Sequence, residues 1–171
     1  TLEYDLFCAV RDKIADEVVR IRNTAKAVAQ LDVFASFSYV AEQNQFVRPK
    51  INEKGRIQIK NGRHPVVERM IPNDMFVAND TLLDNHSNRI AIITGPNMAG
   101  KSTYMRQTAL IVLLAQIGSF VPAESADISI CDRIFTRVGA SDDLASGQST
   151  FMVEMTEVAN ILRNATARSL I

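Results

Sequence analysis

The sequence GPNMAGKST, residues 95–103, lies directly after the apolar run IAIIT, residues 90–94. It fits the pattern G-x-x-x-x-G-K-[ST], which forms a phosphate-binding loop when a buried strand precedes it and a helix follows it. The two glycines let the backbone curl so that its amides point at phosphate oxygens. Lys101 adds a positive charge for the β- and γ-phosphates, and the Ser102 hydroxyl is a candidate Mg²⁺ ligand. The stretch therefore predicts a nucleoside triphosphate site, and a chance match on an ordinary strand–turn–helix is the alternative.

Composition and charge narrow the class of protein. The 171 residues are 47% hydrophobic, which fits one soluble domain with an appendage. The 19 basic and 19 acidic side chains give no net charge that would argue for binding to nucleic acid or a membrane. No apolar stretch is long enough to span a membrane and no signal segment is visible, so we expect a cytoplasmic protein without membrane contact. Cys8 and Cys131 have no metal-site spacing and are expected to be buried small hydrophobic residues.

The first 48 residues contain neither Gly nor Pro, and apolar residues recur there every three or four positions. This pattern predicts one long amphipathic helix, with a break near Asp32 as an alternative. Such a helix either packs on the core or connects two parts of a protein. Its length favours the connector, because it exceeds the usual helix of about 8–20 residues.

Beyond Pro49 the pattern is that of a mixed α/β domain. Short apolar runs bounded by turn-forming residues predict strands, and a repeat of about 3.6 residues predicts helices. The Asn61-Gly62 pair predicts a turn, and Gly118 predicts a helix end. The predicted strands are 56–60, 89–94, 120–121, 134–138 and 168–171, and the predicted helices are 102–117 and 150–164.

A second polar stretch, DDLASGQSTF at residues 142–151, stands at the start of the predicted helix 150–164. Its hydroxyls and free amides suit a helix N-cap, and they also suit a bound anion. The residues alone leave both interpretations open. In the capping interpretation Ser149 or Thr150 caps the helix, with Glu154 or Glu157 in its first turns.

Three stretches together resemble the ATPase domain of the MutS family of DNA mismatch repair proteins: GPNMAGKSTYMRQ at 95–107, DRIFTRVGA at 132–140 and DLASGQSTFMVEM at 143–155. RHPVVE at residues 63–68 fits the same family. The resemblance covers essentially the whole chain, is strongest from His64 to Asn164, and is closer to bacterial members. Ala99 differs from the Gly that many members carry, and alanine is tolerated there if its φ is negative.

The resemblance implies an α/β fold in which part of the sheet of an ABC-type P-loop NTPase, with flanking helices, follows the long amphipathic helix. The sheet is expected to be parallel. Residues 1–42 would be a helical lever or connector segment, and residues 43–171 the N-terminal part of the ATPase domain. ATP or ADP and Mg²⁺ would be the cofactors.

The family also implies roles for individual residues. Ser149 of one subunit would act in trans on the nucleotide held by its partner in a homodimer, and Asn97 would lie near the γ-phosphate. Phe76 would stack on adenine beside Val77, although a core role for Phe76 remains open. The implied catalytic residues are Lys101, Asn97 and Ser149, the metal ligand is Ser102, and the nucleotide-binding residues are Gly95, Pro96, Asn97, Met98, Ala99, Gly100, Lys101, Ser102, Thr103, Phe76 and Val77.

The implied function is that of an ATPase whose ATP binding and hydrolysis, in the intact dimer, control clamp states on mismatched DNA. Mismatched double-stranded DNA, bound through other domains, and a MutL-type repair protein would be its partners. The Asp and Glu of the Walker B motif are expected just beyond Ile171, so hydrolysis by these residues alone should be impaired. Another ABC-type ATPase, or a helical interaction module with a vestigial nucleotide site, remains the alternative.

Overall fold

A computed structural model describes residues 1–71, 75–137 and 150–171. The chain forms two compact units, Thr1–Val40 and Ala41–Ile171. The first unit is helical, and the second contains a sheet, the helix that follows the phosphate-loop sequence, and the C-terminal helix.

Two helices make up the N-terminal region: α1 (Leu2–Asp16) and α2 (Val18–Gln43), the last residues of which belong to the second unit. The predicted helix is therefore interrupted at Glu17 and not near Asp32. Glu17 has φ −99° and ψ 3°, and its amide donates to the carbonyl oxygen of Ile14 at 3.1 Å. This i→i−3 bond tightens the turn, and the α-helical ladder resumes after it.

The apolar residues that predicted an amphipathic helix lie on the surface of this region. Every residue of α1 is exposed or half-buried, and Ala41 is the one buried residue of α2. Leu31 and Phe34 are 67% and 64% exposed. The 3.6-residue repeat thus identified helices correctly but did not identify a buried face.

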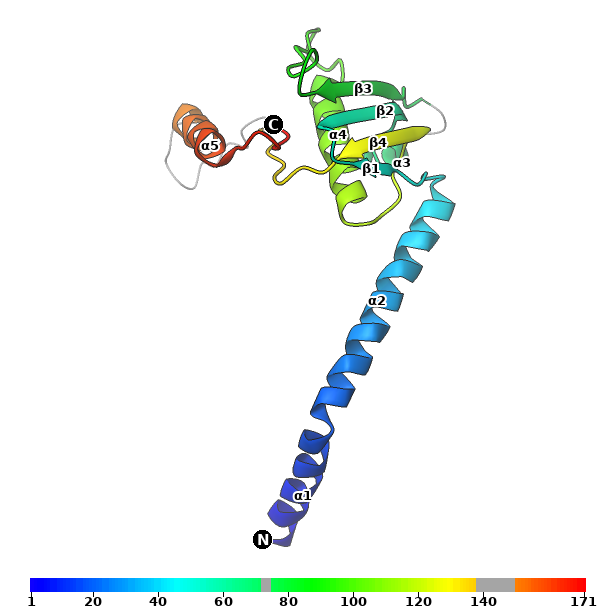
Figure 1. Cartoon of the computed structure of the whole chain (residues 1–171), viewed down its shortest axis with the longest axis vertical. Coiled ribbons are helices and arrows are strands. Elements are labelled where there is room, and N and C mark those ends of the chain that lie inside the picture. The colour runs from blue at the N-terminus through cyan, green and yellow to red at the C-terminus, as the bar shows by residue number, and fades with distance from the viewer. Residues whose placement is uncertain (72–74, 138–149) are drawn as a thin grey trace. The chain divides into compact units, whose positions relative to one another are not determined.

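A four-stranded mixed sheet forms the centre of the second unit, in the order β1–β4–β2–β3 (Figure 1). β1 pairs parallel with β4, whereas β2 pairs antiparallel with both β4 and β3. The strands are β1 (Lys50–Asn52), β2 (Arg56–Gly62), β3 (Asn79–Asp84) and β4 (Ser125–Ser129).

The predicted strand 56–60 is confirmed as the greater part of β2, but the predicted turn at Asn61-Gly62 is wrong. β2 continues through Gly62, and its pairing with β3 shifts register between Ile59 and Gly62. Asn61 has φ +47° at this irregularity. Asparagine tolerates that left-handed conformation, so the pair makes a bulge within the strand and not a chain reversal.

α4 (Lys101–Gln116) covers one face of the sheet and closes the core (Figure 1). Ile59 of β2, Ile111 of α4 and Ile128 of β4 are 0% exposed. Complete burial of one such side chain stabilises a fold by about 1.5–3 kcal/mol. This core holds in place the helix that begins at Lys101.

The predicted end of α4 at Gly118 is confirmed. Gly118 has φ +86°, and its amide donates to the carbonyl of Ala115 at 3.2 Å. The amide of Ser119 donates to the carbonyl of Leu114 at 3.0 Å. These two bonds form a Schellman motif, which favours glycine at the left-handed position.

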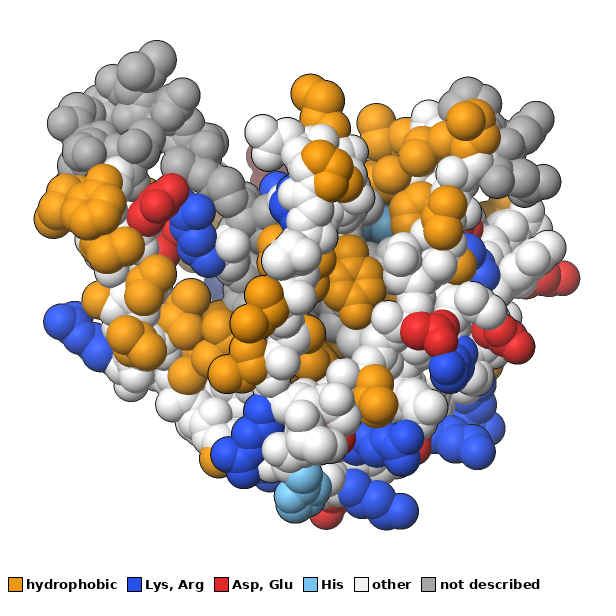
Figure 2. All heavy atoms as spheres, turned by 90° about the horizontal axis from the view of Figure 1, so that it is seen from above, with side chains coloured by type: hydrophobic (Ala, Val, Ile, Leu, Met, Phe, Trp, Pro, Cys, Tyr) orange, Lys and Arg blue, Asp and Glu red, His pale blue; other side chains and the backbone are white. Residues whose placement is uncertain are grey.

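The predicted buried strand 89–94 is wrong. Residues 90–96 lie outside the sheet, and Ile90 and Ile92 are 84% and 87% exposed. Figure 2 shows hydrophobic side chains gathered in patches on the face seen from above. A strand needs a neighbour to accept its backbone hydrogen bonds, and β1–β4 pair with one another instead.

The predicted strands 120–121, 134–138 and 168–171 form only isolated bridges. Val121 pairs with Val47, and Ile134 pairs in parallel with Leu170. The α/β class is therefore confirmed, but the expected parallel sheet does not form among residues 1–71, 75–137 and 150–171.

Two helices complete the unit: the short α3 (Val67–Met70) and α5 (Thr150–Asn164), which confirms the prediction for 150–164. Cys8 and Cys131 are free thiols and both are half-buried, so neither is fully buried as predicted, although Cys131 packs against the core. No helix in the described part of the chain is both long enough and apolar enough to cross a membrane.

Candidate functional site

The phosphate-loop sequence is an exposed loop that leads into α4. Residues 95–100 are all exposed, and Gly95, Met98 and Gly100 have positive φ values of 152°, 64° and 81°. Ala99 is not among the residues with positive φ, as its side chain requires. Met98 adopts a conformation that costs a non-glycine residue about 1–2 kcal/mol, which stores strain in the loop.

Lys101 folds back over this loop. Its Nζ donates to the carbonyl oxygens of Gly95 at 2.8 Å and Pro96 at 2.5 Å. Gly100 is the N-cap of α4, so free backbone amides and the positive end of the helix dipole lie beside the ammonium group. A cation and a helix N-terminus at one loop fit a phosphate group.

The Ser102 hydroxyl follows Lys101 directly and is exposed. A hydroxyl at this place fits an Mg²⁺ ion that is shared with bound phosphates. Across the described residues, no three His, Cys, Asp or Glu side chains form a cluster that could hold a metal ion. Asn97 is exposed and Thr103 is half-buried, and the roles assigned to both remain predictions.

Phe76 and Val77 lie in the segment 75–78, immediately before β3. Phe76 is half-buried and Val77 is 76% exposed. The side-chain amide of Asn79 donates to the carbonyl of Val77 at 2.8 Å, which fixes the turn into the strand. The partial exposure of Phe76 is compatible with a stacking role and with a packing role.

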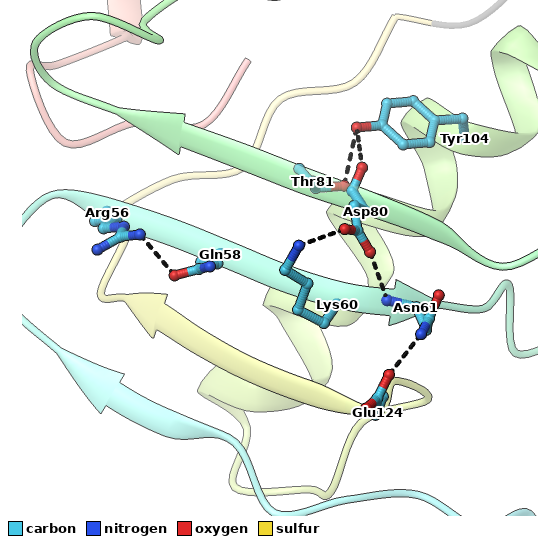
Figure 3. Close-up of polar contacts among 8 residues, drawn as sticks. All are labelled: Arg56, Gln58, Lys60, Asn61, Asp80, Thr81, Tyr104 and Glu124. Atoms are coloured by element: carbon cyan, nitrogen blue, oxygen red, sulfur yellow. Dashed lines mark hydrogen bonds and ion pairs between the residues drawn. The ribbon is translucent and has the colours of Figure 1, made fainter.

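A hydroxyl contact joins the start of β3 to α4 (Figure 3). Thr81 Oγ1 donates to Tyr104 Oη at 2.9 Å, and Tyr104 Oη donates to the carbonyl of Asp80 at 3.1 Å. Sequence reasoning did not single out these residues. The one available signal was that Tyr104 lies three residues after Lys101.

The side chain of Asp80 is held on the opposite side by β2 (Figure 3). Its carboxylate accepts from Lys60 Nζ at 2.5 Å and from the Asn61 amide at 2.9 Å. The hydrogen bond from Lys60, followed by that from Asn61, lowers the pKa of Asp80. Asn61 Nδ2 in turn donates to Glu124 at 2.5 Å. The beginning of β3 is therefore held to β2 by the side chain of Asp80 as well as by the backbone pairing of the two strands.

The RHPVVE motif has a structural role. Arg63 Nε donates to Glu68 at 2.8 Å, and Arg63 Nη2 donates to the carbonyl of Asn44 at 2.9 Å. His64 is buried, and its Nδ1 accepts from the amides of Val66 and Val67 at 3.3 Å each. Burial lowers the pKa of His64, and its Nδ1 accepts from the amide of the first residue of α3.

A cavity of about 800 Å³ lies near the loop, and Ile93 before the loop and Tyr104 after it are among its lining residues. Its lining includes Ile57 of β2, Leu83 of β3, Met105 of α4 and Leu170. The predicted nucleotide-binding residues do not line it. The candidate phosphate site is therefore at the surface of the loop, outside a cavity that apolar side chains line together with charged ones such as Asp84 and Arg89.

Ser149 and most of the stretch 142–151 lie outside the described residues, so the predicted action of Ser149 in trans remains a prediction. Beside that stretch, Arg137 forms ion pairs with Glu154 and, at 3.4 Å, with Glu157. Both glutamates of α5 therefore bind an arginine from the preceding segment.

Comparison with known proteins connects these residues to one family. Residues 91–171 match the family model described as MutS domain V. The whole chain is 77% identical to the DNA mismatch repair protein MutS of Lachnoclostridium phytofermentans, covering 18% of that protein. It is 64% identical over 99% of its length to the MutS of Acetivibrio thermocellus, covering 20% of that protein, and 57% identical over 100% of its length to the MutS of Clostridium perfringens, covering 19%. The chain thus spans about a fifth of the length of these relatives.

Proposed function

The chain belongs to the MutS family, and from that premise we propose that it is the ATP-binding part of a DNA mismatch repair protein. The observation that carries the proposal is the position of Lys101, whose ammonium group lies on the carbonyls of an exposed loop at the start of α4. The loop sequence fits the phosphate-binding pattern, and the geometry fits an anion.

Each residue of the loop has a role in this proposal. The Lys101 ammonium would leave the loop carbonyls for the β- and γ-phosphates and neutralise their charge. Ser102 would contribute a hydroxyl to Mg²⁺, and Asn97 would lie near the γ-phosphate. Phe76 and Val77 would contact the adenine. The bound Mg²⁺ would supply charge neutralisation at the phosphates.

In the intact protein, the proposal extends to an ABC-type P-loop ATPase fold and to a homodimer in which Ser149 acts on the partner's nucleotide. ATP binding and hydrolysis would control how the protein holds mismatched DNA, with a MutL-type protein as repair partner in the cytoplasm. The names of the relatives support the mismatch-repair part of this extension, because each is called a DNA mismatch repair protein. They give no support to a transporter-type ATPase or to a purely structural helical module.

Isothermal titration with ATP, with and without Mg²⁺, tests the proposal. The natural protein that carries this chain should bind ATP saturably, and Lys101→Ala should weaken binding at least tenfold, because a hydrogen bond to a charged group contributes about 1.5–3 kcal/mol. Lys26→Ala is the matched control, because Lys26 is an exposed lysine on α2.

Two results would overturn the proposal. One is a folded protein that does not bind ATP. The other is equal binding by the Lys101→Ala and Lys26→Ala variants, since that would place the nucleotide somewhere other than at this loop.

A further inference from the structure

Tyr104 has no role in the proposed function, but it links two elements of the candidate site. It lies one turn into α4, three residues after Lys101, so one helix carries both residues. Its Oη accepts a hydrogen bond from Thr81 at 2.9 Å and donates to the carbonyl of Asp80 at 3.1 Å (Figure 3). One side chain thus makes two polar contacts from α4 to the first residues of β3.

Those residues of β3 directly follow the segment 75–78, here called the base segment, which contains Phe76 and Val77. The hydrogen bond from Asn79 to the Val77 carbonyl fixes the turn between the base segment and the strand. Asp80 is held on its other side by Lys60 and by the Asn61 amide. The downstream end of the base segment is therefore attached to the sheet, and through Tyr104 to the phosphate-loop helix.

Two buried threonines lie on the interior side of this contact. Thr81 and Thr108 are 5% and 7% exposed, and their hydroxyl oxygens lie 3.3 Å apart. Thr108 also donates to the carbonyl of Tyr104 at 3.1 Å. Hydroxyls shielded in this way make stronger hydrogen bonds than exposed ones and hold a more defined geometry.

We propose that Tyr104 is a positioning residue that sets the distance between the base segment and the phosphate loop, so that one ATP molecule reaches both. The inference rests on the proposed function, because it takes the base segment to contact adenine and the loop to hold phosphate. Tyr104 is not among the residues proposed to contact the nucleotide. Its effect follows from geometry: a ligand that bridges two elements depends on their spacing, whereas a ligand that contacts only one does not.

Titration with two probes tests the inference: ATP, which would span both elements, and inorganic tripolyphosphate, which would contact only the loop. In the natural protein that carries the chain, Tyr104→Phe keeps the ring and removes the hydroxyl. We expect its Kd for ATP to rise about fivefold, which corresponds to one hydrogen bond, while its Kd for tripolyphosphate stays unchanged. Tyr39→Phe, on the exposed part of α2, is the matched control and should change neither value.

A second variant keeps the test sharp if the first one loses stability. Thr81→Val removes the hydroxyl that donates to Tyr104 and keeps the shape of the side chain. Both substitutions remove the contact between Thr81 and Tyr104, and Tyr104→Phe also removes the bond to the Asp80 carbonyl. Because one contact is shared, the double variant should lose less ATP affinity than the two single losses combined. A merely structural role would shift the unfolding midpoint without shifting the ratio of the two Kd values.

Equal weakening of both probes by Tyr104→Phe, or no change in either, would overturn the positioning role while leaving the proposed function intact. Failure of the unmodified protein to bind ATP, or binding of tripolyphosphate that is insensitive to Lys101→Ala, would overturn the proposed function and this inference with it.

Discussion

The helices of residues 1–40 and the core formed by the sheet and α4 contain similar apolar residues but bury them very differently. In the core, Ile59, Ile111 and Ile128 are completely buried. In α2, Leu31 and Phe34 are about two-thirds exposed (67% and 64%). A repeat of apolar residues shows which face of an element favours burial, and burial itself requires a second surface that covers that face.

The phosphate loop connects an exposed apolar segment to a helix with a buried apolar face. The buried face of α4 fixes the helix, while residues 95–100 at its start are all exposed. Ile90 and Ile92, just before the loop, are exposed like the apolar residues of α2. The loop is therefore followed by a helix that packs on the core and carries Lys101 and Tyr104, and it is preceded by the exposed residues 90–94.

Removal of a core side chain should have the largest effect. Ile128→Ala should lower the free energy of unfolding by about 2–5 kcal/mol, because it removes buried methylene groups and leaves a cavity beneath α4. Urea denaturation followed by circular dichroism measures the loss. A loss below about 1 kcal/mol would place Ile128 with surface residues and would break the comparison.

Gln107 is an exception within the core. It is 0% exposed, and its Oε1 and Nε2 are buried with no hydrogen-bond partner among residues 1–71, 75–137 and 150–171. Gln107→Met keeps the length of the side chain and removes the amide, so the free energy of unfolding should rise by about 1–3 kcal/mol. Gln30→Met on the exposed face of α2 is the control and should change stability by less than about 0.5 kcal/mol. Destabilisation by Gln107→Met would mean that the amide has a partner in the folded protein.

The same contrast explains which elements could be predicted from the sequence. α4, α5 and most of β2 were predicted, because their periodicity is strong and their ends carry clear signals such as Gly118. β4 was missed, because three of its five residues, Ser125, Asp127 and Ser129, are polar. It is a strand because it lies between β1 and β2 and buries Ala126 and Ile128 in the core.

The error at residues 89–94 has the opposite cause. The run is apolar enough for a buried strand, but its burial depends on a neighbouring strand that a local pattern cannot supply. The candidate site divides in the same way. Lys101 and Ser102 follow from a local motif, whereas the bond from Tyr104 to Asp80 joins positions 24 residues apart and follows only from the packing of α4 on the sheet.

A change in pH should alter the free energy of unfolding less than the substitutions of Ile128 and Gln107 do. Burial, and then the positive charge of Arg106, lower the pKa of His64 below its ordinary value of 6.5. Between the folded pKa and about pH 6.5, His64 therefore binds a proton in the unfolded chain but not in the folded chain. The stabilisation is complete above about pH 6.5 and is lost as the pH falls through that value toward the folded pKa.

His64→Asn keeps a side-chain acceptor for the Val66 and Val67 amides and removes the titration. Urea denaturation at pH 7.5 and pH 5.5 should show a smaller decrease for this variant than for the unmodified chain. An equal decrease in both would assign the pH dependence to other groups.

The smallest effect should come from the helical unit and gives the other limit of the comparison. Leu31→Ala in residues 1–171 should change the free energy of unfolding by less than about 0.5 kcal/mol, because the side chain is 67% exposed and alanine is the better helix former. Leucine and isoleucine lose similar apolar area when they are truncated to alanine. The difference in stability loss between Leu31→Ala and Ile128→Ala therefore measures how deeply each side chain is buried. A loss as large as that of Ile128→Ala would mean that another surface covers Leu31 in solution. The 3.6-residue repeat of α2 would then mark a buried face after all, and the contrast between the two regions would disappear.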